Sequence, residues 1–210
     1  MNKLNSEQLN NLISDSTILI ADNSGPKVLL LANKNCLKFF RLKKWLSSSL
    51  FYHYADRFVD NANKLNSLNI PTLKILNTYK IPKDFIKYSK LTKAVEYTYV
   101  RGHSIRDLIK NNLFTQEHAH QFGKFMAKLH QLGVYFRACH FGNILYDRNN
   151  ELDNRFKLID IENMKFYKQP LSKQRVLRNF KQMTRYDIDK NWLTMYKKNF
   201  EAGYGATIEF

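Results

Sequence analysis

The sequence predicts an α+β fold in which a β-rich first half precedes a mostly helical second half. Short apolar runs of strand length, separated by turn residues, fill much of the first hundred positions. After Gly102, apolar residues recur instead at the three- and four-residue spacing of amphipathic helices. The hydrophobic content of 44% indicates a folded core, and 210 residues suffice for one large core or two small lobes.

The first half contains three apolar runs, then one helix, then two further runs. The first three are STILIAD (16–22), KVLLLAN (27–33) and CLKFFR (36–41), with the turn sequence NSGP between the first two. Phe58, Ala62, Leu65 and Leu68 then follow at helical spacing and predict a helix over about 50–68. The runs TLKIL (72–76) and KAVEYTYV (93–100) complete the predicted set. We therefore expect a small antiparallel sheet with one main helix packed on it.

The second half begins with a short helix marked by Ile105, Leu108 and Ile109. A longer helix is predicted from an N-cap at Thr115 to a stop at Gly133. Its expected buried residues are Phe122, Phe125, Met126 and Leu129. NILYD and FKLID predict a hairpin around the polar loop RNNELDN. The last forty residues predict one or two basic helices whose inward residues are Leu177, Phe180, Met183, Trp192, Leu193 and Tyr196.

The charge balance predicts an anionic partner. Thirty-four lysines and arginines against eighteen acids give a net charge of +16, which suits phosphate, nucleic acid or a membrane surface. No run approaches the roughly 20 apolar residues of a spanning helix, and MNKLNSEQLNN lacks the apolar core of a signal peptide. Cys36 and Cys139 do not make a disulfide framework, so we expect a reducing, cytoplasmic environment.

Two polar clusters end apolar runs in the second half, FRACHFGNIL (136–145) and LIDIE (158–162). Together with the order of elements, they resemble a two-lobed protein-kinase-like fold. FRACHFGNIL is similar to the HGDLHPGNIL loop of small bacterial kinase-like phosphotransferases, and LIDIE to their IDFE or IDWE variant of the DFG motif. The style is that of the lipopolysaccharide core kinases and of toluene-tolerance-type proteins, which are similar to the KEOPS kinase subunit. The likeness covers roughly residues 15–190.

The resemblance implies ATP and Mg²⁺ as cofactors and two lobes, a nucleotide-binding lobe over 1–99 and a catalytic, metal-binding lobe over 100–210. Asp160 would bind Mg²⁺, and Asn143 would complete the shell of the metal with its amide oxygen. Hard oxygen ligands suit this ion. Taken singly, either residue could equally be a turn or cap residue, and it is the register of His140, Gly142 and Ile144 with the family loop that favours the metal site.

In the first lobe, the resemblance assigns Lys38 to the α- and β-phosphates. Its helix partner would be Asp60, or less favourably Asp56, because no glutamate stands there. The segment with Glu96, Tyr97 and Tyr99 would receive adenine through its backbone. The phosphate-covering loop is poor, since ADNSGP has one glycine where the protein-kinase pattern has three.

The family loop carries a catalytic aspartate five residues before its asparagine, and here Ala138 stands at that position. His140 could act as a substitute base, or it could simply pack within the loop. Arg137, beside the gap, could bind an anionic substrate or stabilise the loop. His118 and His120 resemble a metal pair, but residues two apart face different ways on a helix, so we expect both to be exposed.

Three functions compete at this point. The first is an ATP-dependent kinase for a sugar of the lipopolysaccharide core, with an anionic sugar or glycolipid acceptor and peripheral contact with the cytoplasmic face of the inner membrane. The second is a pseudokinase, a nucleotide-binding or protein/RNA interaction module, which Ala138 and the missing helix glutamate favour. Plain nucleic-acid binding rests on charge alone. The sequence does not predict an oligomeric state.

Overall fold

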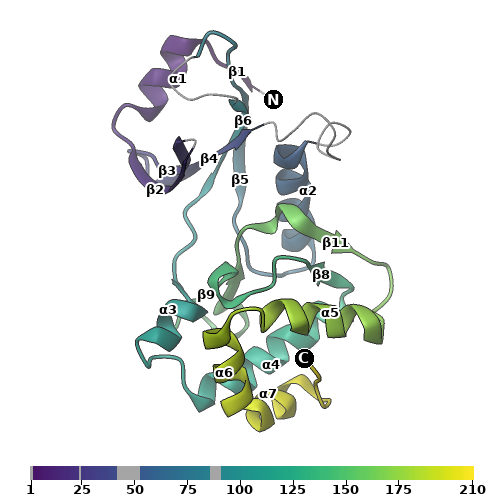
Figure 1. Ribbon diagram of the computed structural model, residues 1–210. Helices are drawn as coiled ribbons and strands as arrows, with labels where there is room; N and C mark the ends of the chain where they lie inside the picture. The colour runs from purple at the N-terminus through teal and green to yellow at the C-terminus, as the bar shows by residue number, and fades with distance from the viewer. Residues whose placement is uncertain (1, 24, 42–52, 86–90) are drawn as a thin grey trace. The chain divides into compact units, whose positions relative to one another are not determined.

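The computed structural model describes residues 2–23, 25–41, 53–85 and 91–210, and these fall into two units (Figure 1). Unit 1 comprises Met1–Lys64 and Leu73–Val100, and unit 2 comprises Leu65–Thr72 and Arg101–Phe210. The first positions of the helix predicted from about residue 50 lie outside the described residues.

Unit 1 is built on a six-stranded sheet in the order β1-β5-β6-β4-β3-β2. The strands are β1 (Asn2–Lys3), β2 (Thr17–Asp22), β3 (Gly25–Leu30), β4 (Asn35–Arg41), β5 (Ile75–Lys80) and β6 (Leu91–Thr98). All neighbours pair antiparallel except β1 with β5. The predicted antiparallel sheet is therefore confirmed, with β1 as an added edge strand.

A helix covers each face of this sheet. Because successive strand residues point to opposite faces, Leu37 and Phe39 of β4 face α1 (Ser6–Ile13) and share a buried cluster with its Leu9. On the other face, Phe58 of α2 (Tyr54–Ser67) lies 5.6 Å from the ring of Phe40 and 5.5 Å from that of Tyr97. The periodicity of α2 predicted this helix correctly.

The α1 helix is an element that was not predicted from the sequence. Its start carries a capping box in which Gln8 N donates to Asn5 Oδ1 (2.8 Å) and Asn5 N donates to Gln8 Oε1 (2.9 Å). That signal is present in NSEQ but was not used.

Unit 2 is mostly helical, with α3 (Ile105–Lys110), α4 (Gln116–Gln131), α5 (Lys173–Met183), α6 (Asp187–Met195) and α7 (Lys197–Tyr204). The hairpin predicted from NILYD and FKLID is present as β9 (Ile144–Tyr146) and β10 (Phe156–Leu158), joined by β7 (His103–Ser104) in one small sheet. The expectation of one or two C-terminal helices is wrong, since there are three. The first break follows Thr184, whose hydroxyl donates to Phe180 O (3.0 Å) and ends α5.

The α4 helix forms the centre of unit 2. Its predicted buried residues, Phe122, Phe125, Met126 and Leu129, are all buried. It packs closely on α7 because Gly123 and Gly203 meet the backbones of Phe200 and His120, and a Cβ atom at either glycine would clash. His118 is half-buried, not exposed as expected, because Thr115 N donates to its Nδ1 (3.0 Å) and its ring stacks 4.8 Å from that of Phe114. His120 is half-buried as well.

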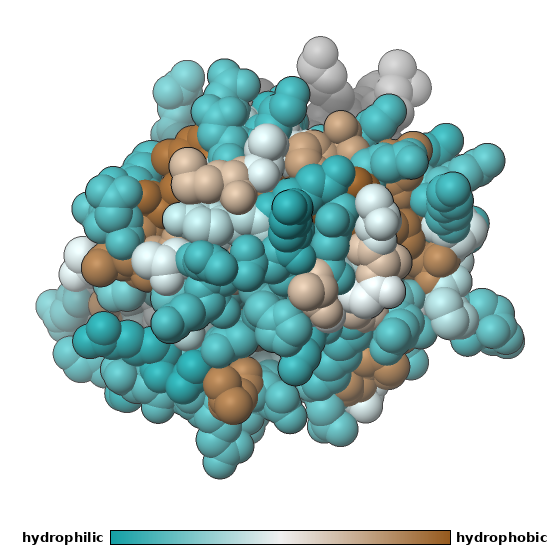
Figure 2. Space-filling model, turned by 90° about the horizontal axis from the view of Figure 1, so that it is seen from below, coloured by the Kyte–Doolittle hydropathy of each residue, from teal (hydrophilic) through white to brown (hydrophobic). Residues whose placement is uncertain are grey.

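Within the described ranges, the helices are all too short or too polar to cross a bilayer. The face shown in Figure 2 is largely hydrophilic, with small separate hydrophobic patches. The thiols of Cys36 and Cys139 are both buried and free, and burial raises their pKa values to about 11 and about 12. They are therefore protonated packing residues at neutral pH.

A buried polar network joins the helices of unit 2. His130 shares one hydrogen bond with Tyr204 Oη (Nδ1, 2.8 Å) and one with Asn179 Oδ1 (Nε2, 2.9 Å). Asn179 Nδ2 donates to Phe136 O (2.6 Å), which fixes the orientation of the amide. His130 Nε2 must therefore carry the proton, and Nδ1 accepts from the tyrosine. Burial lowers the pKa of His130 to about 4.

This network predicts a stability change in mild acid. The unfolded chain takes up a proton at His130 near pH 6.5, whereas the folded chain does so only near the lowered pKa of about 4. The free energy of unfolding should therefore fall as the pH is lowered from 6.5 to 4, by up to about 3 kcal/mol from this group. Urea unfolding across this range should show a shallower pH dependence in His130→Gln than in the wild type. The matched control is His103→Gln, at an exposed position, and an unchanged slope in His130→Gln would contradict the assignment.

Candidate active site

The loop after β8 (Val134–Phe136) is fixed by its own backbone. Cys139 N donates to Phe136 O (3.1 Å), His140 N to Ala138 O (2.9 Å) and Asn143 N to His140 O (2.9 Å). The last of these bonds closes the short 3₁₀ helix η1 (Phe141–Asn143), which leads directly into β9. The loop thus has one defined conformation before any side chain is considered.

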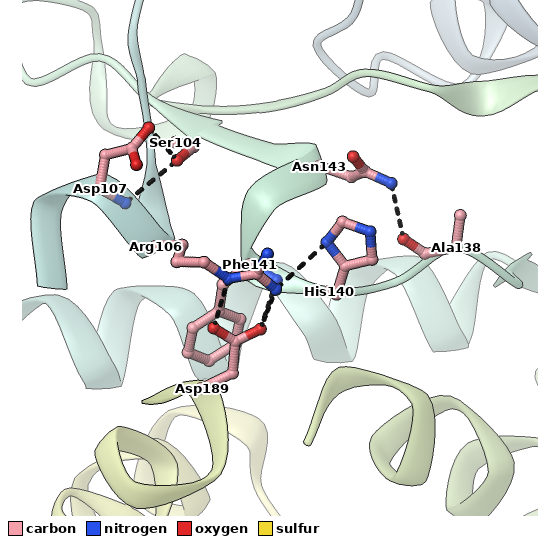
Figure 3. Close-up of polar contacts among 8 residues, drawn as sticks. All are labelled: Ser104, Arg106, Asp107, Ala138, His140, Phe141, Asn143 and Asp189. Atoms are coloured by element: carbon pink, nitrogen blue, oxygen red, sulfur yellow. Dashed lines mark hydrogen bonds and ion pairs between the residues drawn. The ribbon is translucent and has the colours of Figure 1, made fainter. Parts of the chain in front are cut away.

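Asn143 and Asp160 are brought together by the hairpin. Ile159 N donates to Asn143 O (3.0 Å), so the residue before Asp160 is hydrogen-bonded to the backbone of Asn143. The Asn143 side chain crosses the loop and donates through Nδ2 to Ala138 O (3.1 Å). Its Oδ1 points away from Ala138 (Figure 3). Asp160 has left-handed backbone angles (φ 56°, ψ 45°), a conformation that costs a non-glycine residue about 1 kcal/mol or more and that is enriched at functional sites.

A buried ion pair anchors this loop from behind. Asp189 on α6 is fully buried and accepts from Arg106 of α3 at Nε (2.9 Å) and Nη2 (2.6 Å). Its Oδ2 also accepts from Phe141 N (3.2 Å), the first residue of η1 (Figure 3). The Arg106 guanidinium lies 4.1 Å from the centroid of the Tyr186 ring. Two helices and the loop are therefore held by one carboxylate.

His140 is held by the same cluster. Its Nδ1 lies 3.5 Å from Arg106 Nη2, and since arginine only donates, Nδ1 acts as the acceptor. Burial, together with the cation of Arg106, lowers the pKa of His140 below its ordinary value. The ring is then neutral with its proton on Nε2. This geometry favours the packing interpretation over a general base, because one nitrogen faces a cation and the other already carries a proton.

Arg137, the remaining candidate of this loop, is exposed. Two residues earlier, Tyr135 on β8 is half-buried, opposite Lys165 of β11 (Met164–Phe166). Arg185 also acts electrostatically on His140. Asp189 and Asp160 act on it with the opposite sign, so charges of both signs lie near this loop.

In unit 1, Lys38 is 4% exposed, whereas a strand lysine usually faces solvent. Its ammonium lies 4.8 Å from the ring centroid of Phe58 and 5.5 Å from that of Phe40, which stabilises a buried cation. Cross-strand register places Lys38 opposite Val28 on one side and opposite Val95 on the other. The lysine thus lies in an apolar row across the sheet.

The structure does not bring Asp60 to Lys38. Asp60 is exposed, and two positions along α2 from Phe58 it faces a different way from the ring that Lys38 contacts. Asp56 is bound elsewhere, with both carboxylate oxygens 2.7 Å from Lys93 Nζ. The buried residues of α2 decide which side of the helix faces the sheet. Neither Asp56 nor Asp60 lies on the same side of the helix as these buried residues.

Glu96 has an unexpected side-chain environment. It is 4% exposed, and its carboxylate accepts from four neutral donors: Asn33 Nδ2 (3.2 Å), Asn35 Nδ2 (2.8 Å), Asn77 Nδ2 (3.0 Å) and Tyr79 Oη (2.7 Å). Burial alone would raise the pKa of Glu96, but these hydrogen bonds outweigh it and leave the pKa lowered. Tyr97 is buried, and Tyr99, at 49% exposed, lies just beyond the end of β6.

The residues of unit 2 fit a magnesium ion that is shared with phosphate. Asn143 Oδ1 and the Asp160 carboxylate are two hard oxygen donors on adjoining segments, the type of ligand Mg²⁺ prefers. Within the described part of the chain, no group of three or more His, Cys, Asp or Glu side chains could hold a metal. A two-ligand protein site leaves the other positions for substrate phosphates and water.

Sequence reasoning missed Asp189 and Arg106. They lie 83 residues apart, in segments that carry no motif. The only sequence signal was a pair of acids, Asp187 and Asp189, after a long basic stretch, in RYDID.

The mixed α and β composition, with its antiparallel sheet and helical unit, agrees with the kinase-like fold that the sequence predicts. The chain belongs to the lipopolysaccharide kinase (Kdo/WaaP) family, whose model matches residues 43–204. No curated protein matches the sequence. A solved structure described as WaaP in complex with acyl carrier protein is similar at 11% identity and a TM-score of 0.46, covering 95% of this chain and 92% of that one. The predicted family and enzyme class are thus confirmed by the family match.

The ion pair behind the loop gives a second prediction. Asp189→Asn should lower the free energy of unfolding by about 3–5 kcal/mol, because Arg106 would be left without its buried partner. Chemical denaturation of unit 2, followed by tryptophan fluorescence of the buried Trp192, measures this. Asp187→Asn, two positions earlier on the same helix and exposed, is the control and should change stability by about 0.5 kcal/mol or less. An Arg106→Met/Asp189→Leu double variant should recover most of the loss, and a double variant as unstable as the single one would refute the ion-pair explanation.

Proposed function

We propose that this protein is an ATP- and Mg²⁺-dependent kinase that phosphorylates a sugar of the lipopolysaccharide core. The observation that carries the proposal is the hydrogen bond from Ile159 N to Asn143 O, which places the residue before Asp160 beside Asn143. Family membership supplies the reaction class. We expect the reaction at the cytoplasmic face of the membrane, where ATP is available.

Asn143 and Asp160 would hold the magnesium ion, which neutralises charge on the phosphates when bound. Lys38 would contact the α- and β-phosphates from the sheet of unit 1, and the apolar row beside it, Val28 and Val95, would contact the base or ribose. Adenine would bind near Tyr99, where the chain leaves β6, because the backbone of Glu96 is paired on both sides within the sheet. The role of each residue is proposed from its surroundings within its own unit.

The transfer itself would proceed without a carboxylate base. The acceptor hydroxyl oxygen bonds to the γ-phosphorus, the bond to the ADP oxygen breaks, and the hydroxyl proton passes to solvent. Positioning and charge neutralisation carry most phosphoryl-transfer catalysis, and a base adds about 10² to 10⁴ in rate. Ala138 therefore favours a slow kinase over an inactive one. Arg137, exposed beside the gap, would bind an anionic group of the sugar acceptor.

The second candidate is a pseudokinase that binds nucleotide and transfers nothing. Ala138 and the absence of Asp60 from the Lys38 side of α2 favour it. The two candidates differ in turnover but share nucleotide binding, so binding and transfer need separate tests.

Nucleotide binding gives the third prediction. Mg-ATP at about a hundred times its Kd should stabilise the protein by roughly 2.7 kcal/mol, a melting shift of about 5–10 °C. Asp160→Asn should abolish the magnesium dependence, and Lys38→Met should weaken the shift, if both residues bind one nucleotide. Asparagine also tolerates left-handed angles, so Asp160→Asn should fold normally. Asp153→Asn, at an exposed position, is the control. No shift with any Mg-nucleotide would refute the kinase and the nucleotide-binding pseudokinase, and would leave only a pseudokinase that binds no nucleotide.

The gap at Ala138 gives the fourth prediction. Ala138→Asp should raise kcat by about 10² to 10⁴, because the loop backbone is already held in place and lacks only the base. His140→Ala should leave kcat within about tenfold, since the neutral ring faces Arg106. Phosphate transfer from radiolabelled ATP to lipopolysaccharide core acceptors measures both. A drop of about 10² or more in His140→Ala would instead make His140 the base, and no transfer by wild type or Ala138→Asp would leave the pseudokinase.

A further inference from the structure

All the charged residues of the segment between Glu162 and Asp187 are basic. It holds seven lysines and arginines and no acid, and it includes β11 and α5. Arg175 is half-buried, with its guanidinium 4.0 Å from the Tyr167 ring centroid. The other six are exposed, and we call them the α5 basic surface: Lys165, Lys168, Lys173, Arg178, Lys181 and Arg185.

The protein does not neutralise these charges itself. Ion pairs within the described residues include those of Arg41, Lys93, Arg106, Lys157 and Lys197. None of the six cations of the α5 basic surface forms an ion pair with a described residue. Like charges on one surface repel one another, and an anionic partner would relieve that repulsion.

The α5 basic surface adjoins the catalytic loop within unit 2. The α5 helix buries Phe180 and Met183, so that Arg178 and Lys181 project on its other side. Asn179 Nδ2 donates to Phe136 O, which ties α5 to the end of β8, and β11 pairs directly with β8. Figure 1 shows α5, β8 and β11 close together in this unit. A partner on this surface would therefore lie beside the loop that holds Asn143.

The arrangement of the charges indicates an extended partner. They are spread over one helix, one strand and their connections, and none lines the pocket beside α4, which is formed by residues such as Lys124 and Leu152. A small ligand is usually enclosed in a concave site, whereas a layer of phosphates attracts a spread of basic side chains.

The aromatic residues of the segment argue against nucleic acid. Proteins that bind single strands stack bases on open aromatic rings. Here Arg175 lies over Tyr167, and Arg106 lies 4.1 Å from the centroid of the Tyr186 ring. The rings are thus engaged by the protein's own arginines.

We propose that the α5 basic surface binds the anionic headgroups of a membrane and so presents the catalytic loop to an acceptor embedded there. The choice of a membrane over other anions rests on the proposed function, because its acceptor is a glycolipid. The contact is electrostatic and peripheral, and it should weaken as salt screens the charges.

Vesicle flotation tests the proposal, using phosphatidylcholine vesicles with and without phosphatidylglycerol. The wild type should float only with the anionic vesicles and should be released at high salt. A Lys173→Gln/Arg178→Gln/Lys181→Gln variant should bind on the order of a hundredfold more weakly, since each surface cation is worth roughly fivefold. Binding to neutral vesicles alone, or no binding to anionic vesicles at physiological salt, would overturn the proposal.

Two controls distinguish binding through the α5 basic surface from an effect of net charge and from an effect on catalysis. A Lys110→Gln/Lys190→Gln/Lys198→Gln variant removes the same charge from other exposed positions of unit 2, and it should bind almost like the wild type. An equal loss there would overturn the assignment to α5. Asp160→Asn should bind vesicles normally while losing transfer, and the α5 variant should still phosphorylate a lipid-free sugar acceptor. A failure of the membrane contact can thus be told from a failure of the kinase function.

Discussion

The pair between Arg106 and Asp189 is the constraint on which the candidate site depends. A carboxylate with no exposed surface cannot be left without a partner, because burying an unpaired charge costs several kcal/mol. Asp189 therefore fixes where α3 and α6 lie around it, and its bond to Phe141 N fixes η1. Gly142 fits beside this pair because a Cβ atom there would lie 3.1 Å from Arg106 Nη1. The positions of His140 and Asn143 follow from that of η1.

Unit 1 stabilises two buried charges in different ways on opposite faces of one sheet. Lys38 lies on the α2 face against aromatic rings, whereas Glu96, in the adjacent strand, points to the α1 face. There, three asparagine amides and a tyrosine hydroxyl supply the hydrogen bonds that a cation would otherwise provide. The donors come from β5, from the start of β4 and from the turn before β4, so the carboxylate on β6 joins three strands of the sheet. The buried charges of Lys38 and Glu96 therefore also contribute to the packing of unit 1.

Local patterns predicted much of this fold. The turn at NSGP, the periodicity of α2 and α4, and the hairpin after the loop all depend on residues near one another in the chain. Asn143 and Asp160 could be proposed from the sequence because each lies in a short motif with fixed spacing, and their roles stay predictions. Asp189 and Arg106 could not be found, because their contact exists only after α3 and α6 have packed. Asp60 was selected by its distance along the chain, whereas the rotation of α2 about its axis decides which residues meet the sheet.

The bond between Asn143 Nδ2 and Ala138 O has a consequence for how this loop changes over evolution. The loop takes only a carbonyl from position 138, and every amino acid has one. The side chain at that position takes no part in this hydrogen bond, so a change there can alter the chemistry and still leave the bond in place. The groups that hold the loop in shape differ from the side chain that would act as the base. A loop of this kind can therefore keep its shape in lineages where its reaction has slowed or ceased.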